Sequence, residues 1–269
     1  MAEPRRHGHP KAQILETGNA LFFYRPLRGV LHPRSSDEIE HVYVALLPDD
    51  QHQHRNRLLT FAQTWYPPIL PGLVLPEERG WAVVTDVTRD PRRLIDAVVR
   101  GEGSADGSTA PTTTPAARAA GDGRYLIARH DDHTDLAYAL HQPRQLGPAQ
   151  QTLLLDPQAS YRVVVKEPCV PSWIGVVDKP TYPSALGEKF DGHVSIPLDP
   201  SSFLDYRWTQ VFLFDGKSDV QTELGIALKR GLENRAEKQA FAALCVEAQR
   251  VRAGSAVDLL KPLVDGSLE

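Results

Sequence analysis

Short runs of apolar, β-branched and aromatic residues are the feature that most constrains how this chain can fold. Each run is only a few residues long and ends at polar, glycine or proline residues, as β-strands separated by turns do. Before residue 100 the runs cover 20–24, 42–47, 58–62 and 81–87. After residue 122 they cover 125–128, 136–140, 161–165 and 210–214. The chain is therefore expected to be rich in β-structure.

Helical patterns are fewer and lie between or after these runs. Asp90 is a suitable N-cap, Pro91 fits the first helical position, and the apolar residues that follow recur on one face, which predicts a helix over 90–100. A short helix is expected over 184–190, and a longer one with an alanine-rich stripe over 232–251.

One internal segment, residues 101–122, is rich in Gly, Ser, Ala, Thr and Pro and has almost no large apolar side chain. Such a composition cannot repay the entropy of ordering, so the segment is expected to be a flexible linker. The predicted parts are a disordered N-terminus at 1–11, a first β-rich unit at 12–100, a second at 123–230, and a C-terminal helix and tail at 231–269. The predicted fold class is α+β: two antiparallel β units with a few peripheral helices.

The two halves resemble each other in sequence. Residues 18–23 match 123–128 in glycine, leucine and apolar character, and 43–48 match 138–143 in the spacing of tyrosine and proline. This similarity indicates an internal duplication, with a ligand or partner bound in a crevice between the copies. The alternative is that short β-rich windows look alike, because apolar runs and turns recur in all of them.

Composition excludes some partners and suggests a compartment. The net charge of −4 over 269 residues gives no global basic field that would favour nucleic acid or an anionic membrane. The first eleven residues lack the apolar core of a signal peptide, and no apolar run approaches the length of a membrane span. Cys169 and Cys245 have no metal-ligand spacing. A cytoplasmic protein is expected.

The segment 129–135, Arg-His-Asp-Asp-His-Thr-Asp, is the most polar one beside an expected strand. Imidazole and carboxylate together suit a divalent transition-metal ion or an acid/base pair. A hairpin here could aim His130 and His133 at one ion, with Asp131 or Asp135 orienting an imidazole. Plain turn chemistry would also produce a polar hairpin of this composition, as a solvated turn. The implied cofactor is a divalent metal ion.

A second candidate site lies at the ends of the first strands of the two halves. Tyr24 ends the first apolar run and Arg25 follows it, and Arg129 follows the corresponding run of the second half. Arginines that flank a strand end can hold a phosphate or carboxylate group, which predicts a small-molecule ligand. The alternative is a pair of solvated loops.

Two motifs also invite a comparison with known sequences. They are Gly-Asn-Ala-Leu-Phe-Phe-Tyr-Arg-Pro at 18–26, and His130 with His-Thr-Asp-Leu-Ala-Tyr at 133–138. Together they resemble an uncharacterised family of conserved bacterial and archaeal proteins over most of residues 14–228. The resemblance implies no activity, so it assigns no catalytic residue.

Function remains open between two classes at this point. The sequence lacks the nucleophile elbow, the phosphate-binding P-loop and the dinucleotide-binding glycine motif. This favours a non-enzymatic binding or interaction protein that uses the crevice between the β units for a protein or small-molecule ligand. The alternative is a metal-dependent, hydrolase-like enzyme with His130 and His133 as ligands. The sequence does not specify an oligomeric state.

Overall fold

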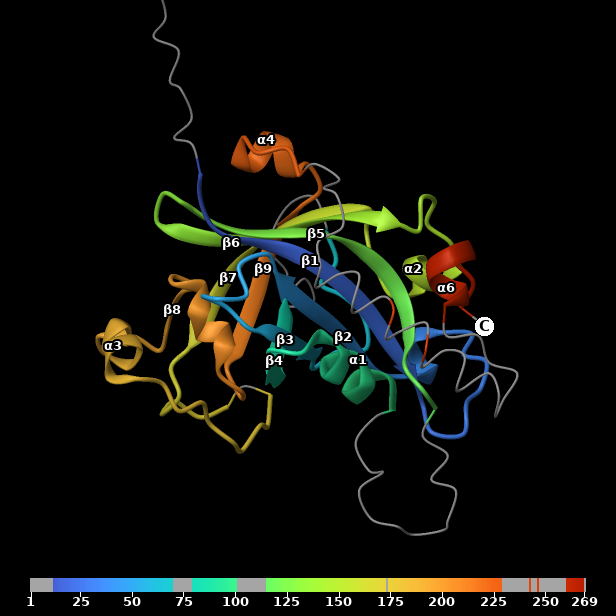
Figure 1. Cartoon of the computed structure of the whole chain (residues 1–269), viewed down its shortest axis with the longest axis horizontal. Coiled ribbons are helices and arrows are strands. Elements are labelled where there is room, and N and C mark those ends of the chain that lie inside the picture. The colour runs from blue at the N-terminus through green and yellow to red at the C-terminus, as the bar shows by residue number, and fades with distance from the viewer. Residues whose placement is uncertain are drawn as a thin grey trace, which may run out of the picture.

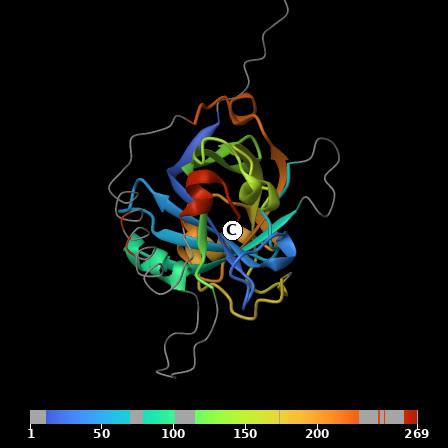
Figure 2. The same ribbon diagram turned by 90° about the vertical axis from the view of Figure 1, so that its right-hand side faces the viewer.

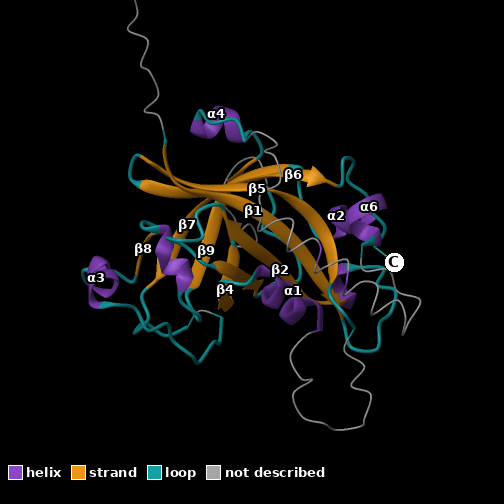
Figure 3. Cartoon of the chain, in the orientation of Figure 1, coloured by secondary structure: helices purple, strands orange, loops and turns teal. Residues whose placement is uncertain are grey.

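The computed structural model describes residues 12–69, 79–100, 115–172, 174–228, 242, 246 and 260–268. Its long strands dominate the molecule and the helices are short (Figures 1 and 3). The strands are β1 (Gln13–Pro26), β2 (Ile39–Pro48), β3 (Asn56–Phe61), β4 (Gly80–Thr88), β5 (Arg118–His130), β6 (His133–Gln142), β7 (Gln158–Lys166), β8 (Ser195–Pro197) and β9 (Gln210–Lys217). The helices are α1 (Pro91–Arg100), α2 (Pro148–Thr152), α3 (Ser184–Gly187), α4 (Val220–Leu224) and α6 (Lys261–Asp265).

Eight of the strands close into one antiparallel β-barrel in the order β1-β2-β3-β4-β9-β7-β6-β5. Two antiparallel pairings join the halves of the chain: β1 with β5, and β4 with β9. The pairing of β6 with β7 completes the ring. The short β8 continues the line of β6 along β7. Closure leaves the eight strands without a long exposed edge.

Strand β1 shows why an apolar run without alternation forms a barrel wall here. Successive side chains point to opposite faces of a strand. Phe22 therefore packs in the cluster that fills the barrel, and Phe23 packs in a second cluster outside it. The apolar stripe of α1, which includes Leu94 and Val98, covers this outer face. Both faces of β1 are thus buried, as its sequence predicts.

Packed side chains fill the barrel, and a small apolar cavity of about 30 Å³ remains among them. The C-terminal end of the chain lies over one end of the barrel (Figure 2). There, the side chain of Leu268 belongs to the interior cluster, and its carbonyl accepts a hydrogen bond of 2.8 Å from the hydroxyl of Tyr24. The barrel is therefore a core and not a channel.

Local predictions of strands and helices are confirmed, and the predicted fold class is wrong. Each of the eight apolar runs lies in a strand of the barrel, and the helix expected over 90–100 is α1. The short helix expected over 184–190 is α3 with the 3-10 turn Glu188–Phe190 that follows it. However, the two halves are not two β units with a crevice between them. They share one closed sheet, because the strands at their borders pair with each other.

The predicted boundaries need further correction. Residues 118–122, expected at the end of the linker, lie in β5. The N-terminal 1–11 segment, most of the linker and nearly all of the 232–251 helix lie outside the described residues. Within the described part, no helix has the length and apolar character that a bilayer crossing requires. The duplication stays a prediction.

Candidate metal centre

The β5–β6 hairpin brings three of the predicted ligand residues onto one face. His130 is directly opposite His133 in the strand register, and Asp131 with Asp132 forms the turn between them. Asp131 adopts a left-handed backbone with φ of 52°, a conformation that Asp tolerates better than most residues. Opposed residues point the same way, and so do residues two apart along a strand. Asp135 therefore lies on the same face as both histidines.

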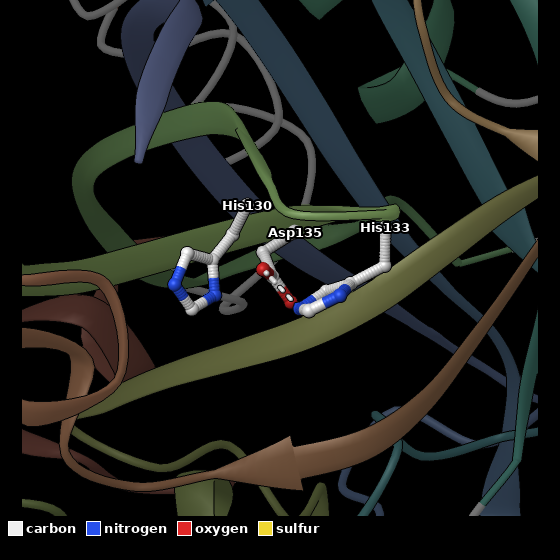
Figure 4. A group of neighbouring side chains, drawn as sticks. All are labelled: His130, His133 and Asp135. Atoms are coloured by element: carbon white, nitrogen blue, oxygen red, sulfur yellow. Dashed lines mark ion pairs between the residues drawn. The ribbon is translucent and has the colours of Figure 1, made fainter. Parts of the chain in front are cut away.

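One donor atom from each of His130, His133 and Asp135 lies within 4.8 Å of the others. His133 Nε2 is 3.3 Å from Asp135 Oδ2, and the two imidazole rings stand nearly perpendicular with centroids 5.3 Å apart. Figure 4 shows the three side chains pointing to the same side of the hairpin. Ligands bonded to one ion at about 2.1 Å are at most about 4.2 Å apart, so only a small side-chain adjustment separates this arrangement from ligation.

A neighbouring carboxylate orients the imidazole ring of His133. Asp132 Oδ1 is 3.2 Å from His133 Nδ1, at hydrogen-bonding geometry. An ionised carboxylate can only accept this bond, so Nδ1 carries the proton, and in the neutral ring Nε2 is then the nitrogen that can bind a metal ion. In metal sites a ligating histidine is commonly oriented in this way, because its other ring nitrogen donates a hydrogen bond to a carboxylate. Asp131 Oδ2 lies 4.0 Å from His130 Nε2, a longer approach of the same kind.

The inner atoms of the cluster are withdrawn from solvent and lack hydrogen-bond partners. His130 Nδ1, His133 Nε2 and Asp135 Oδ2 are all buried and make no hydrogen bond within the described part of the chain. An unsatisfied buried polar atom costs about 1–3 kcal/mol, and natural proteins seldom leave several together. These three atoms are therefore candidates for the ligands of one metal ion.

The electrostatic environment of Asp135 is mixed. The pKa of Asp135 is raised to about 6, mainly by burial; the negative charge of Glu223 on α4 contributes to the rise, while His133, Arg162 and His130 oppose it. Arg162 is opposite Asp135 in the β6–β7 pairing, and its Nε is 3.4 Å from Asp215 Oδ2. Asp215 thus offsets much of the positive charge that Arg162 would otherwise direct at a bound cation.

Two other residues of the predicted sites, Asp131 and Arg129, lie outside the cluster of three ligands. Asp131 does not join the three clustered ligands, and its side chain is 59% exposed. Arg129 points to the other side of the hairpin, pairs with Asp199 at 2.9 Å, and lines an open concavity of about 280 Å³ to which His133 also contributes.

Tyr24 and Arg25 lie inside the molecule, where neighbouring parts of the chain cover them. Arg25 is 3% exposed, and its guanidinium donates to the Tyr43 hydroxyl and to the carbonyls of Val98 and Pro115. It therefore attaches α1 and the start of β5 to the barrel wall. The structure does not bring Arg25 and Arg129 together, because they lie near opposite ends of the paired strands β1 and β5.

A buried ionic network at one end of the barrel was missed by the sequence reasoning. Arg57, fully buried, donates to both carboxylate oxygens of Glu16 and, through Nε at 2.9 Å, to Asp205 Oδ1. Tyr125 donates to Glu16 Oε1 at 2.6 Å. His54 Nδ1 lies 3.2 Å from Glu16 Oε2 and 3.6 Å from Asp205 Oδ2, although neither contact is a linear hydrogen bond. The only signal in the sequence was a charged residue, Arg57, directly beside an apolar run.

Comparison with known proteins adds no relative. No family model, curated protein or solved structure matches this chain. The resemblance to an uncharacterised bacterial and archaeal family stays a prediction, and inference about function depends on the chemistry of the residues described above.

Proposed function

We propose that this protein binds one divalent transition-metal ion on the outer face of its barrel, with His130, His133 and Asp135 as ligands. The observation that carries the proposal is the convergence of three buried ligand atoms that make no hydrogen bond to any described residue. Two imidazoles and one carboxylate form a ligand set that suits zinc or a neighbouring first-row metal.

The competing explanation is an ion pair between His133 and Asp135. That pair needs a proton between Nε2 and the carboxylate, and the 3.3 Å contact lacks hydrogen-bonding geometry. It also leaves the buried Nδ1 of His130 unexplained. A metal ion would satisfy all three atoms at once, while Asp132 holds the outer nitrogen of His133.

A three-ligand site leaves coordination positions open for water or a substrate, which is a feature of catalytic and not of structural zinc sites. A metal-dependent enzyme is thus the class that this site favours over a partner-binding protein. A cytoplasmic location stays a prediction.

The test is metal content and metal affinity in a background that removes the terminal His7 and His9 pair. We expect one equivalent of metal after size exclusion, and a Co²⁺ absorption spectrum with nitrogen and oxygen ligation. The His130→Ala/His133→Ala variant should lose both signals, and Asp135→Asn should weaken the affinity. The control His32→Ala/His52→Ala removes two exposed imidazoles and should keep both signals.

Two results would overturn the proposal. If the protein and the His130→Ala/His133→Ala variant bind metal equally, or neither binds it, the cluster is not a metal centre. In the second case a loss of stability in His133→Ala alone would identify the ion pair as its role.

A further inference from the structure

A second concave region lies beside the buried ionic network and is distinct from the metal centre. It has a volume of about 390 Å³, and its wall includes three basic side chains and two aromatic ones: Arg55, Lys179, Arg207, Tyr206 and Trp208. We call it the basic pocket. Its volume falls within the range of sites for small molecules. The chain is acidic overall, so three cations around one hollow are a local departure from its net charge of −4.

Among the residues that the structure describes, the three cations have no carboxylate partner of their own. No carboxylate of the described residues lies within 4.0 Å of the charged groups of Arg55, Lys179 or Arg207. Their side chains are exposed, and the potential they create is directed into a concave surface, where fields are concentrated. The pocket therefore attracts an anion.

Among the described residues of the wall, Asp205 is the one carboxylate, and its negative charge is paired with Arg57. It accepts hydrogen bonds from the guanidinium of Arg57 and from the backbone amide of Arg55. Burial opposes ionisation, but the contacts with His54, Arg57 and that amide outweigh it and lower the pKa of Asp205. The carboxylate thus holds the floor of the pocket in place while Arg57 neutralises it.

The turn that carries two of the pocket residues is built under constraint. Trp208 has a left-handed backbone with φ of 70°, which is costly for a bulky residue and occurs mostly where the surroundings impose it. Its amide donates to the Val84 carbonyl at 2.7 Å. Arg207 stacks over the indole at 4.9 Å and donates to the Thr85 carbonyl at 2.9 Å. The guanidinium is therefore held with its outer nitrogens free of strong internal bonds.

We propose that the basic pocket binds the phosphoryl group of a small molecule, with Arg55, Lys179 and Arg207 as its recognition groups. Guanidinium groups match phosphate oxygens in paired hydrogen bonds, and a lysine adds a point charge. The exposed part of Trp208 and Tyr206 offers an apolar surface to the rest of such a molecule. A free phosphate ion and a phosphate ester share this chemistry, and the test separates them.

Titration calorimetry on chelator-treated protein is the test, because chelation prevents phosphate from binding at the metal centre. The probes are inorganic phosphate, adenosine monophosphate and adenosine. Both phosphate-bearing probes should bind and compete with each other, while adenosine should not compete. Tighter binding of the monophosphate than of phosphate would identify an ester as the preferred form, and the reverse order would identify the free ion.

Two variants establish the location. Arg55→Gln/Lys179→Gln removes two exposed charges without a side-chain hydrogen bond in the described structure, so folding should be retained. We expect its dissociation constant to rise by about tenfold or more, since charge-assisted bonds contribute about 1.5–3 kcal/mol each. The control Arg28→Gln/Arg34→Gln removes the same charge from an exposed loop and should change it less than about twofold. Any of three results overturns the proposal. They are an equal loss of phosphate affinity in both variants, binding of adenosine as tight as that of adenosine monophosphate, and no binding at millimolar phosphate.

Discussion

The candidate metal centre and the buried ionic network combine the same groups, histidine and carboxylate, in different arrangements. In the network, Arg57 lies between Glu16 and Asp205 and satisfies both. At the hairpin, His133 and Asp135 face each other at 3.3 Å with nothing between them. The network pairs its carboxylates with a permanent cation, Arg57, whereas the hairpin sets Asp135 beside a histidine, whose charge depends on protonation.

This difference indicates which of the two is structural. A buried carboxylate must be paired or neutralised, because the cost of burying an isolated charge is large. The network meets that requirement within the chain, so it needs no ligand and can hold the end of the barrel closed. The hairpin meets it only by taking up a proton or a cation, which makes its charge state depend on the solution.

The largest expected effect is from removing the internal cation. Arg57→Met should destabilise the protein by about 3–5 kcal/mol, because it leaves two buried carboxylates without their partner. Denaturant unfolding measures this loss. The control is Arg100→Met, since Arg100 pairs with Asp96 on the exposed side of α1 and should change stability by less than about 0.5 kcal/mol. Equal effects of the two substitutions would contradict the structural role of the network.

Adding the proposed metal ion should have the next largest effect. A metal at 100 times its dissociation constant stabilises the folded state by about 2.7 kcal/mol, which thermal unfolding with and without Zn²⁺ or Co²⁺ detects. His133→Ala should abolish the gain. Tyr125→Phe, which changes only the network, should retain it in full. A gain that survives in His133→Ala would place the ion elsewhere.

Removing one hydrogen bond from the network should cost less. Tyr125→Phe keeps the buried ring but removes the hydroxyl that donates to Glu16 at 2.6 Å. A bond to a charged group contributes about 1.5–3 kcal/mol, against about 1 kcal/mol for a neutral pair. Tyr161→Phe is the matched control, because its hydroxyl donates to the neutral carbonyl of Pro67 at 2.6 Å. Chemical denaturation of both variants should give the larger loss for Tyr125→Phe, and the reverse order would contradict the model of a charged acceptor.

The two regions also differ in how far sequence could reveal them. His130, His133 and Asp135 lie within six residues of the sequence, so one expected hairpin was enough to predict that they meet. Glu16, Arg57 and Asp205 come from distant parts of the chain, and only closure of the barrel brings them together. Local patterns contain no information about such contacts.

The same distinction explains the fold. Each strand was visible as an apolar run, and α1 had clear helix signals at both ends. The barrel closes because β1 pairs with β5 and β4 pairs with β9. The sequences of β1 and β4 do not indicate whether the free edge of each strand pairs with the other half of the chain or faces solvent. The burial of Tyr24 and Arg25 was not predicted, for a related reason. Their position at the end of an expected strand suggested exposure, but the C-terminal end and α1 cover them.

The smallest expected effect is a pH dependence that belongs to the network. The polar contact with Asp205 raises the pKa of His54 above its ordinary value of 6.5, and the charge of Glu16 adds to this, while burial and Arg57 oppose it. A raised folded-state pKa means that protonated His54 stabilises the fold fully below about 6.5. This contribution is lost as pH rises through the folded-state value.

His54 is partly exposed, so the change should stay below about 1 kcal/mol, the range of solvent-accessible ion pairs. Unfolding free energies of the protein and of His54→Gln, measured from pH 6 to 8 with chelator present, should converge as pH rises. His32→Gln, at an exposed loop position, should run parallel to the unmodified protein throughout. If the His54→Gln curve also runs parallel, His54 is not protonated as part of the network, and Arg57 alone balances the two carboxylates.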